Sequence, residues 1–379
     1  MRVVVIGAGV VGSAVAAGLT RRGAHVTLLE ERYPGAGTTS TSFTWVNSNN
    51  KIPEPYFELN HAAVRAHHAL GGQGFFATGH LECAGDEAHQ AELAIRLERL
   101  ESRGYPAERI TPAQAIELEP DLAPQPEGTE YVYFPEEAHV FPAPLLARLL
   151  SEARAGGARI ETGTAVRDIT SGANEATVTL ADGSTRTADV VIACTGRWTN
   201  MLVDIPVLDT RLFGTVTNGF LASTTAVPAR LTRVLTTDRL NLRPDGGGRL
   251  LMQALDLDEA ADADTPPGDE IGAEMLARLP GVLTGTTGAR IERIRVGQRA
   301  MPADGVTVAG FTDPAERIYA VATHSGITLA PLLADLVAAE VHGEESPLLA
   351  PFRPGRFTDG VAPAEAALAL KAARRPGQQ

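Results

Sequence analysis

The sequence predicts an α/β fold that begins with a Rossmann-like, dinucleotide-binding βαβ unit and continues into at least one further domain. Three observations support this prediction. The chain has 379 residues, which is more than one average domain contains. It has 44% hydrophobic and 21% charged residues, as folded globular proteins do. Residues 1–30 alternate two apolar runs with a glycine-rich turn and a helical stretch.

The glycine-rich turn GAGVVG follows the run VVVI at residues 3–6, which is typical of a buried parallel strand. Gly7 permits the tight turn into a helix predicted over 13–22. Gly9 lets the backbone approach a pyrophosphate, and Gly12 lets helix and strand pack closely. The phosphates would lie at the helix N-terminus, where N–H groups favour negative charge.

A second strand is predicted over residues 25–29, and it ends at Glu30. A carboxylate at this point can accept a hydrogen bond from a ribose 2′-hydroxyl, and it disfavours a 2′-phosphate. The unit therefore predicts NAD or FAD and not NADP. The alternative interpretation is a glycine-rich turn with a structural role only.

Composition excludes several classes of partner. Lys and Arg number 33 and Asp and Glu number 46, so the net charge is −13, which argues against nucleic acid or an anionic membrane as the main partner. The two cysteines, Cys83 and Cys194, cannot form a disulfide framework and fit a cytoplasmic location. Residues 3–19 lack a basic leader and a cleavage site, so we expect no signal peptide. No stretch has the length of a membrane span, and the histidines lack metal-site spacing.

Four further segments decide between NAD and FAD: GAGTTSTSFTWVNSNN at 35–50, a strand, hairpin turn and CTG motif over 163–196, RVGQRAMPADGVTVAG at 295–310, and the strand, THSG turn and helix over 317–343. Together with the N-terminal motif, they resemble the D-amino-acid oxidase family of flavoproteins. That family includes glycine and sarcosine oxidases and D-amino-acid dehydrogenases. The resemblance runs from residue 2 to about residue 357 and implies FAD as the cofactor.

The resemblance also implies where the cofactor binds. Thr41 and Ser42 match phosphate contacts, and the following loop reaches the flavin ring, although a polar surface loop is the alternative. Val166 matches a backbone contact to adenine, the N-terminus of the last helix matches the pyrimidine end of the flavin, and Gly326, Ile327 and Thr328 match the backbone that contacts it. The expected cofactor-binding residues are Gly7, Gly9, Val11, Gly12, Glu30, Arg32, Thr41, Ser42, Trp45, Val46, Val166, Thr195, Gly196, Gly326, Ile327 and Thr328.

On the substrate side, the resemblance places Arg299 where some members bind a carboxylate, which suits the two parallel N–H donors of a guanidinium. The alternative is a structural arginine. His324 and Asn47 are candidates to orient the substrate. Lys51 does not match the oxygen-activating lysine of sarcosine oxidases, so we expect it at the surface. Ala300 stands near the position of their covalent cysteine, so FAD should bind noncovalently.

The spacing of apolar residues and the positions of turn-forming and capping residues predict the remaining elements. We expect a core or cleft role for His139 and a solvated surface loop over the acidic stretch 256–269. A hairpin turn is expected at Asp182 and Gly183, and a helix N-terminus at Thr111 and Pro112. The other expected elements are helices at 55–70, 91–103 and 142–155, strands at 75–83, 176–180, 189–193 and 318–322, and a last helix that begins near Ala330 and Pro331.

The resemblance implies a discontinuous FAD-binding domain of Rossmann type, formed by 1–80, 138–210 and 295–360. Residues 81–137 and 211–294 would form an inserted substrate-binding domain with an antiparallel sheet plus helices. Residues 361–379 would form a peripheral tail.

The predicted activity is FAD-dependent oxidation of the C–N bond of an amino acid or amine, with hydride transfer to flavin N5 and with oxygen or another carrier as electron acceptor. Two alternatives remain open. The chain could be a dehydrogenase that passes electrons to a carrier other than oxygen, or a flavin-binding subunit that is inactive without a partner chain. A homo-oligomer is possible.

Overall fold

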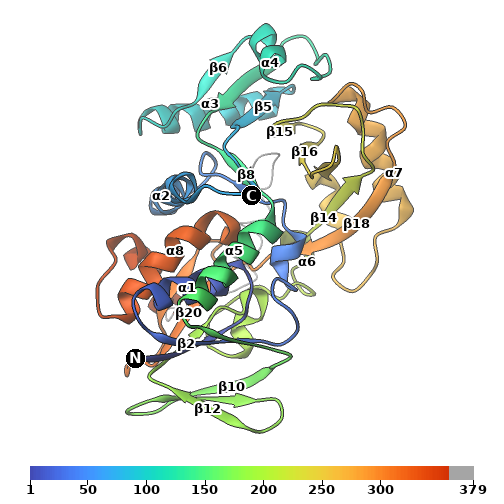
Figure 1. The fold of residues 1–379 in the computed structure, drawn as a ribbon. Coiled ribbons are helices and arrows are strands. Elements are labelled where there is room, and N and C mark those ends of the chain that lie inside the picture. Colours follow the sequence, from blue (N-terminus) through green and yellow to red (C-terminus); the bar gives the residue numbers. More distant parts are fainter. Residues whose placement is uncertain (358–379) are drawn as a thin grey trace.

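The computed structural model describes residues 1–357, and its centre is a six-stranded sheet (Figure 1). The strand order is β19-β20-β13-β1-β2-β9, and every pair is parallel except β19 with β20. The strands span, in that order, Val308–Phe311, Ile318–Ala322, Val190–Ala193, Arg2–Ile6, His25–Glu30 and Arg159–Thr162. The predicted Rossmann-type βαβ unit is therefore present and forms the middle of this sheet.

Both faces of the six-stranded sheet are buried, because successive side chains of a strand point to opposite faces. Val3 and Val5 of β1 belong to a core shared with the helices. Val4 and Ile6 belong to a second core shared with the three-stranded antiparallel sheet β10–β12. The strands of that sheet span Val166–Ser171, Ala176–Leu180 and Thr185–Ala188, and the predicted turn at Asp182 and Gly183 joins the last two.

Helices cover the face of the sheet opposite β10–β12 (Figure 1). They are α1 (Val10–Arg21), α2 (Glu54–Leu70), α5 (Pro142–Ala155) and α8 (Gly326–Val341). Helices α1 and α8 approach closely at Gly18, where an added Cβ would lie 1.9 Å from the carbonyl oxygen of Ala334. The glycine is what allows the two backbones to meet.

An eight-stranded sheet forms the other large layer, in the order β18-β14-β17-β16-β15-β5-β7-β6. All of its pairs are antiparallel except β15 with β5. Its strands span, in sheet order, Ile291–Gln298, Asn218–Thr224, Leu250–Gln253, Asn241–Pro244, Val234–Thr237, His80–Ala84, Glu130–Phe134 and Glu108–Ile110. The helices of this part are α3 (Glu87–Glu101), α4 (Pro112–Leu118), the short α6 (Gly214–Thr217) and α7 (Asp269–Arg278).

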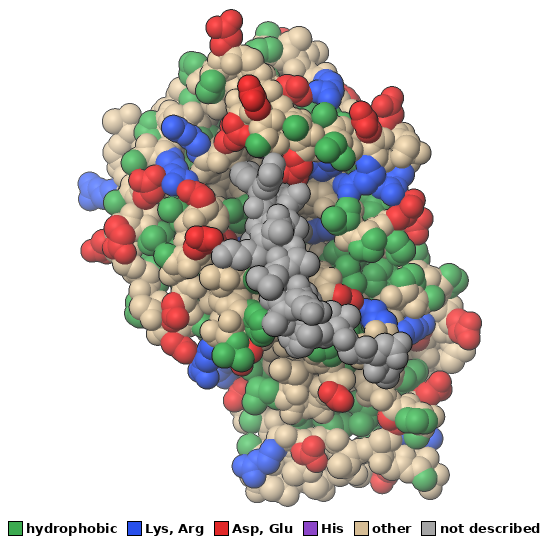
Figure 2. Space-filling view, turned by 180° about the vertical axis from the view of Figure 1, so that it is seen from behind, with side chains coloured by type: hydrophobic (Ala, Val, Ile, Leu, Met, Phe, Trp, Pro, Cys, Tyr) green, Lys and Arg blue, Asp and Glu red, His purple; other side chains and the backbone are tan. Residues whose placement is uncertain are grey.

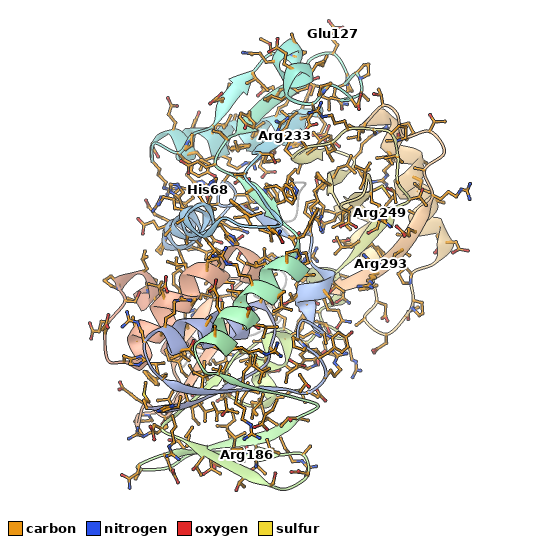
Figure 3. All side chains as sticks on the ribbon, viewed as in Figure 1. His68, Glu127, Arg186, Arg233, Arg249 and Arg293 are labelled. Atoms are coloured by element: carbon orange, nitrogen blue, oxygen red, sulfur yellow. The ribbon has the colours of Figure 1, made fainter. Side chains whose placement is uncertain are left out.

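A small sheet in the order β3-β8-β4 lies between the two large sheets, with strands Trp45–Val46, Ala138–Val140 and Phe75–Phe76. The β10–β12 sheet, which carries Arg186, lies at one end of the molecule, and Glu127 lies at the opposite end (Figure 3).

Several predicted elements are confirmed and several are wrong in their limits. The capping box at Thr111 is present, since its hydroxyl accepts from the backbone N–H of Gln114. The expected strand at 75–83 is two strands, and its parts pair in different sheets. Helix α3 begins at Glu87 rather than at residue 91, because the Asp86 side chain caps it. Helix α8 begins at Gly326, so Pro331 lies inside the helix and not at its first turn.

The expectation of a solvated loop over 256–269 is wrong for its first part. Residues Leu255–Ala260 form a 3₁₀ helix, and Asp258 is buried. Its carboxylate accepts a hydrogen bond from the backbone N–H of Phe220 at 2.9 Å. A run of acidic residues does not reveal which single member faces inward.

Acidic and basic side chains are interspersed over the face shown in Figure 2. None of the helices in the described part of the chain is long and apolar enough to span a bilayer. The predicted peripheral tail at 361–379 lies outside the described residues.

Candidate cofactor and substrate site

A cavity of about 540 Å³ lies at the carboxyl ends of the central strands. It is lined by Gly7 after β1, Glu30 at the end of β2, Thr195 after β13 and Thr323 after β20. Open parallel sheets bind their ligands at this edge. The volume also lies in the usual range for cofactor and ligand sites.

The three glycines of the N-terminal motif have separate structural roles. Gly7 has φ +97°, and a Cβ there would lie 2.6 Å from the carbonyl oxygen of Cys194. A Cβ on Gly12 would lie 1.9 Å from the carbonyl oxygen of Gly7, so Gly12 packs helix against strand and does not line the cavity. Gly9 lines the cavity and precedes α1, and the Thr39 hydroxyl accepts from the backbone N–H of Val10 at 3.0 Å. Val11, the next residue of the first turn, also lines the cavity, where a helix N-terminus favours an anionic ligand.

Glu30 lines the same cavity, and its carboxylate is fixed by two backbone N–H groups. Its Oε2 accepts from Ala8 at 2.8 Å and its Oε1 from Arg32 at 2.9 Å. Each carboxylate oxygen has two acceptor positions, so a fixed Glu30 can still accept from a ribose hydroxyl. Other predicted residues on this cavity wall are Val11, Arg32, Val166, Thr195, Gly196, Gly326 and Ile327.

Sequence inspection missed part of this wall. Two guanidinium groups lie near the Trp198 ring, with the Cζ of Arg197 at 3.7 Å and that of Arg32 at 5.9 Å from its centroid. All three residues line the cavity. The CTG motif that precedes Arg197 gave the only signal, because it places the following residues at the carboxyl end of a central strand.

A second helix N-terminus, that of α8, meets the cavity at Gly326 and Ile327. Two helix N-termini at the cavity, a fixed carboxylate at the end of β2 and a cavity of this size fit an elongated dinucleotide such as FAD. At Ala300 the wall carries a methyl group, so this position has no atom that could tether a cofactor covalently.

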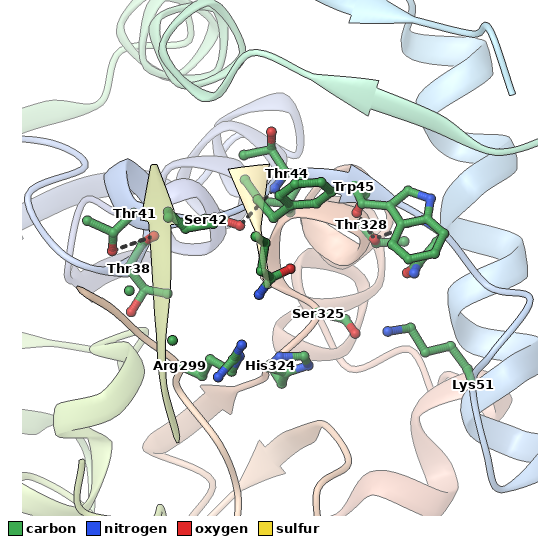
Figure 4. A pocket seen from close by; sticks show the side chains of 17 residues that line it. Thr38, Thr41, Ser42, Thr44, Trp45, Lys51, Arg299, His324, Ser325 and Thr328 are labelled. Carbon is green, nitrogen blue, oxygen red and sulfur yellow. Dashed lines mark hydrogen bonds between the residues drawn. The ribbon is translucent and has the colours of Figure 1, made fainter. Parts of the chain in front are cut away.

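A smaller polar pocket adjoins this cavity, and Thr38, Ser42, His324 and Ile327 line both. The predicted residues Trp45, Asn47, Arg299 and Thr328 also line the smaller pocket (Figure 4). Five of the predicted cofactor-binding residues do not line the large cavity. Gly12 packs helix against strand and Val46 is buried in the hydrophobic core, while Thr41, Trp45 and Thr328 line only the smaller pocket. Thr38 and Thr39, which were not predicted, line the large cavity.

Arg299 is anchored to the eight-stranded sheet. Its Nη1 donates to the carbonyl oxygen of Asn218 at 2.6 Å, and its Nη2 donates to Asp258 Oδ2 at 3.1 Å. These bonds use two of the five N–H donors of a guanidinium, and the side chain lines the pocket. The buried member of the acidic stretch thus orients the arginine.

The expectation that Lys51 lies at the surface is wrong, because its relative exposure is 4% and it lines the smaller pocket. Burial lowers the pKa of its ammonium group to about 8, and the nearby Glu137 charge opposes this shift. Glu137 is buried and accepts from the backbone N–H groups of Ser48 and Asn49 at 3.1 and 3.0 Å. These bonds hold the loop that carries Lys51.

Two other histidines have packing roles. His139 is buried and stacks on Phe76 with ring centroids 4.8 Å apart. Burial, together with the Arg243 charge, lowers its pKa to about 3, so it is neutral at physiological pH. His67 makes a 2.8 Å hydrogen bond to the carbonyl oxygen of Ile327, which supports the first turn of α8 at the cavity.

Comparison with known proteins gives one family. The model of the FAD dependent oxidoreductase family matches residues 2–340. A glycine oxidase from Bacillus licheniformis is 26% identical over 360 residues, which cover 90% of this chain and 92% of the relative.

Two solved structures show the same fold. The crystal structure of glycine oxidase from Geobacillus kaustophilus has a TM-score of 0.83 at 23% identity, covering 95% of this chain and 100% of that one. L-proline dehydrogenase from P. horikoshii has a TM-score of 0.82 at 21% identity and covers 95% and 98% of the two chains.

Proposed function

The chain belongs to the FAD-dependent oxidoreductase family, and from this premise we propose that it oxidises the C–N bond of an amino acid or amine to an imine. The observation that supports the proposal is that the two pockets adjoin. His324 and Ile327 line both the dinucleotide-sized cavity and the polar pocket that contains Arg299. When bound, FAD supplies the acceptor for the hydride that leaves the substrate carbon.

For the cofactor, we propose that the first turn of α1 and Gly9 receive the pyrophosphate and that Glu30 accepts from a ribose hydroxyl. The N-terminus of α8 at Gly326 would lie at the flavin end, where its dipole stabilises negative charge. In this proposal, the six-stranded sheet belongs to the FAD-binding domain and the eight-stranded sheet to the substrate-binding domain. The boundaries differ from those expected from the sequence at β5 and β18, since His80 and residues 295–298 belong to the eight-stranded sheet.

For the substrate, we propose that Arg299 binds the carboxylate and that His324 and Asn47 orient the amine. The amine must be neutral, because its lone pair forms the new C=N bond as the hydride departs from carbon. Phe43, Trp45 and Leu221 give the pocket apolar wall atoms that exclude water from the reacting carbon.

The test is anaerobic reduction of the FAD-loaded protein by single compounds, followed by admission of air. The panel contains D-, L- and N-methyl amino acids and simple amines, and loss of the visible flavin absorbance is the measurement. Bleaching by one class identifies the substrate type. Prompt recovery of colour in air indicates an oxidase, and slow recovery indicates a dehydrogenase that uses another carrier.

Two results would contradict the proposal in different ways. A purified protein that takes up no FAD would remove the cofactor site itself. A yellow protein that no amine or amino acid bleaches, alone or with cell extract as a source of a partner chain, would remove the proposed reaction and leave the cofactor site intact.

A further inference from the structure

The formally charged side chains of the smaller pocket, Arg299 and Lys51, are cationic. His324 also lines the pocket, and no Asp or Glu does so among the described residues. The other polar groups are hydroxyls of Thr and Ser and the amides of Asn47 and Gln253. A wall of this composition favours a ligand with negative charge.

Lys51 and Arg299 each have a carboxylate behind them, outside the pocket wall. Asp258 bonds Arg299, and the charge of Glu137 favours the protonated form of Lys51. Each carboxylate also accepts backbone N–H groups, from Phe220 for Asp258 and from Ser48 and Asn49 for Glu137. Asp258 therefore fixes the position of the Arg299 guanidinium, and the charge of Glu137 partly offsets the lowering of the Lys51 pKa that burial causes.

The two cations come from different parts of the chain and lie on two sides of the pocket. Arg299 follows β18, while Lys51 precedes α2. Figure 4 shows His324 and Ser325 between them, with the amine of Lys51 directed toward Ser325. A small molecule that lies across this pocket meets one cation at each end.

We propose that the substrate is a dicarboxylic amino acid or amine, with one carboxylate bound by Arg299 and the second by Lys51. This inference rests on the proposed function and specifies its substrate class. A second carboxylate would accept a charge-assisted hydrogen bond from the lysine. An aliphatic side chain would instead place apolar atoms against a buried ammonium group, which is unfavourable.

The test measures binding and not turnover. The FAD-loaded protein is titrated by isothermal calorimetry with unreactive acids of equal chain length, namely succinate against butyrate and glutarate against pentanoate. We expect each diacid to bind at least about tenfold more tightly than its monoacid, the scale of one added charge-assisted contact.

Variants assign this preference to Lys51. Lys51→Gln should abolish most of the diacid preference, and Lys51→Arg should retain it. Arg293→Gln is the matched control: it also removes one positive charge, but Arg293 is exposed on β18 (Figure 3) and lines neither pocket. This control should bind both acids as the unmodified protein does.

Equal affinities for diacid and monoacid in the unmodified protein, or no measurable binding of either, would overturn the inference without use of any variant. A diacid preference that survives Lys51→Gln would overturn the assignment to Lys51. The outcome is separable from the proposed function, because reduction of the flavin by any amino acid or amine supports the reaction, whether or not the protein prefers diacids.

Discussion

At the scale of single residues, the ion pair between Arg299 and the buried Asp258 supports a direct prediction. Arg299→Ala should leave FAD bound, because the side chain lines only the smaller pocket. It should weaken carboxylate ligands by about 2–3 kcal/mol, the scale of a lost hydrogen bond to a charged group. The measurement is the affinity of the FAD-loaded variant for a small carboxylic acid.

The control for this prediction must address Asp258, because removal of Arg299 leaves a buried carboxylate without its cation. Arg299→Lys keeps a positive charge near Asp258 but lacks the two-pronged donor geometry. It should therefore fold better than Arg299→Ala and still bind carboxylates more weakly than the unmodified protein. Unchanged carboxylate affinity in both variants would remove Arg299 from the substrate site.

Residues whose role follows from local sequence spacing were easier to predict than those whose role depends on a residue far away along the chain. Gly7, Gly9 and Glu30 follow from local spacing in one βαβ unit, and the structure places them at the cavity or its turn. Lys51 could not be predicted in this way. The loop that carries it is held by Glu137, which lies far along the chain, and one lysine in a polar loop carries no local signal of that arrangement.

At the scale of elements, the contact between α1 and α8 sets the geometry of both helix N-termini that meet the cavity. Gly18→Ala would place a methyl carbon 1.9 Å from the carbonyl oxygen of Ala334, and a backbone atom cannot rotate away. We expect the free energy of unfolding to fall by about 2 kcal/mol, the usual scale of overpacking. Chemical denaturation measures this change.

Gly281→Ala is the matched control for Gly18→Ala. Its added Cβ would meet only a side-chain atom of Arg239 at 3.8 Å, which is an ordinary contact. Its effect should stay within about 0.5 kcal/mol. Equal effects of the two substitutions would show that close packing at Gly18 does not determine the stability of the helix pair.

Helix α3 is attached to the eight-stranded sheet through His89, which makes hydrogen bonds to Glu82 at 2.7 Å and to Asp238. Burial alone would lower the pKa of His89, but its bonds to Asp238 and Glu82 raise it from 6.5 to about 9. A raised folded-state pKa gives stability that is complete below pH 6.5 and is lost as the pH rises through 9.

We therefore predict that the free energy of unfolding falls by an amount on the order of 2 kcal/mol between pH 6.5 and 9.5 because of His89. The measurement is the difference in this slope between the unmodified protein and His89→Gln. Lys51, whose pKa burial lowers to about 8, acts in the opposite direction but is present in both proteins and cancels. Identical slopes in the two proteins would contradict the prediction.

Helices and strands were predictable where the apolar spacing is regular or a capping residue is present, as in α5, β20 and the capped start of α4. Errors arose where tertiary contacts decide the limits. Residues 75–83 have the composition of one strand, but Gly79 has φ +81° and divides them between two sheets. Helix α8 begins at Gly326, before Pro331, and its first turn is held by the hydrogen bond between His67 and the carbonyl oxygen of Ile327.

At the scale of the whole molecule, the central cavity is bounded by segments that are far apart in sequence: the turn after β1, the loop after β2, the residues after β13 and the start of α8. A ligand that spans this cavity contacts all four. It binds only the folded arrangement, since the unfolded chain does not bring these segments together. Cofactor binding should therefore be coupled to the stability of the entire six-stranded sheet.

We predict that removal of FAD lowers the melting temperature and that re-addition restores it. Saturation at about 100 times the dissociation constant stabilises a folded protein by about 2.7 kcal/mol, which corresponds to a shift of a few degrees. Circular dichroism of the FAD-free and reloaded protein measures the effect.

Glu30→Gln should reduce this difference in melting temperature, because the amide offers one acceptor oxygen where the carboxylate offers two, and both carboxylate oxygens already accept backbone N–H groups. Equal melting temperatures with and without FAD would mean that FAD does not bind preferentially to the folded protein, which would contradict the proposed cofactor site. An undiminished shift in Glu30→Gln would remove Glu30 from the ribose contact.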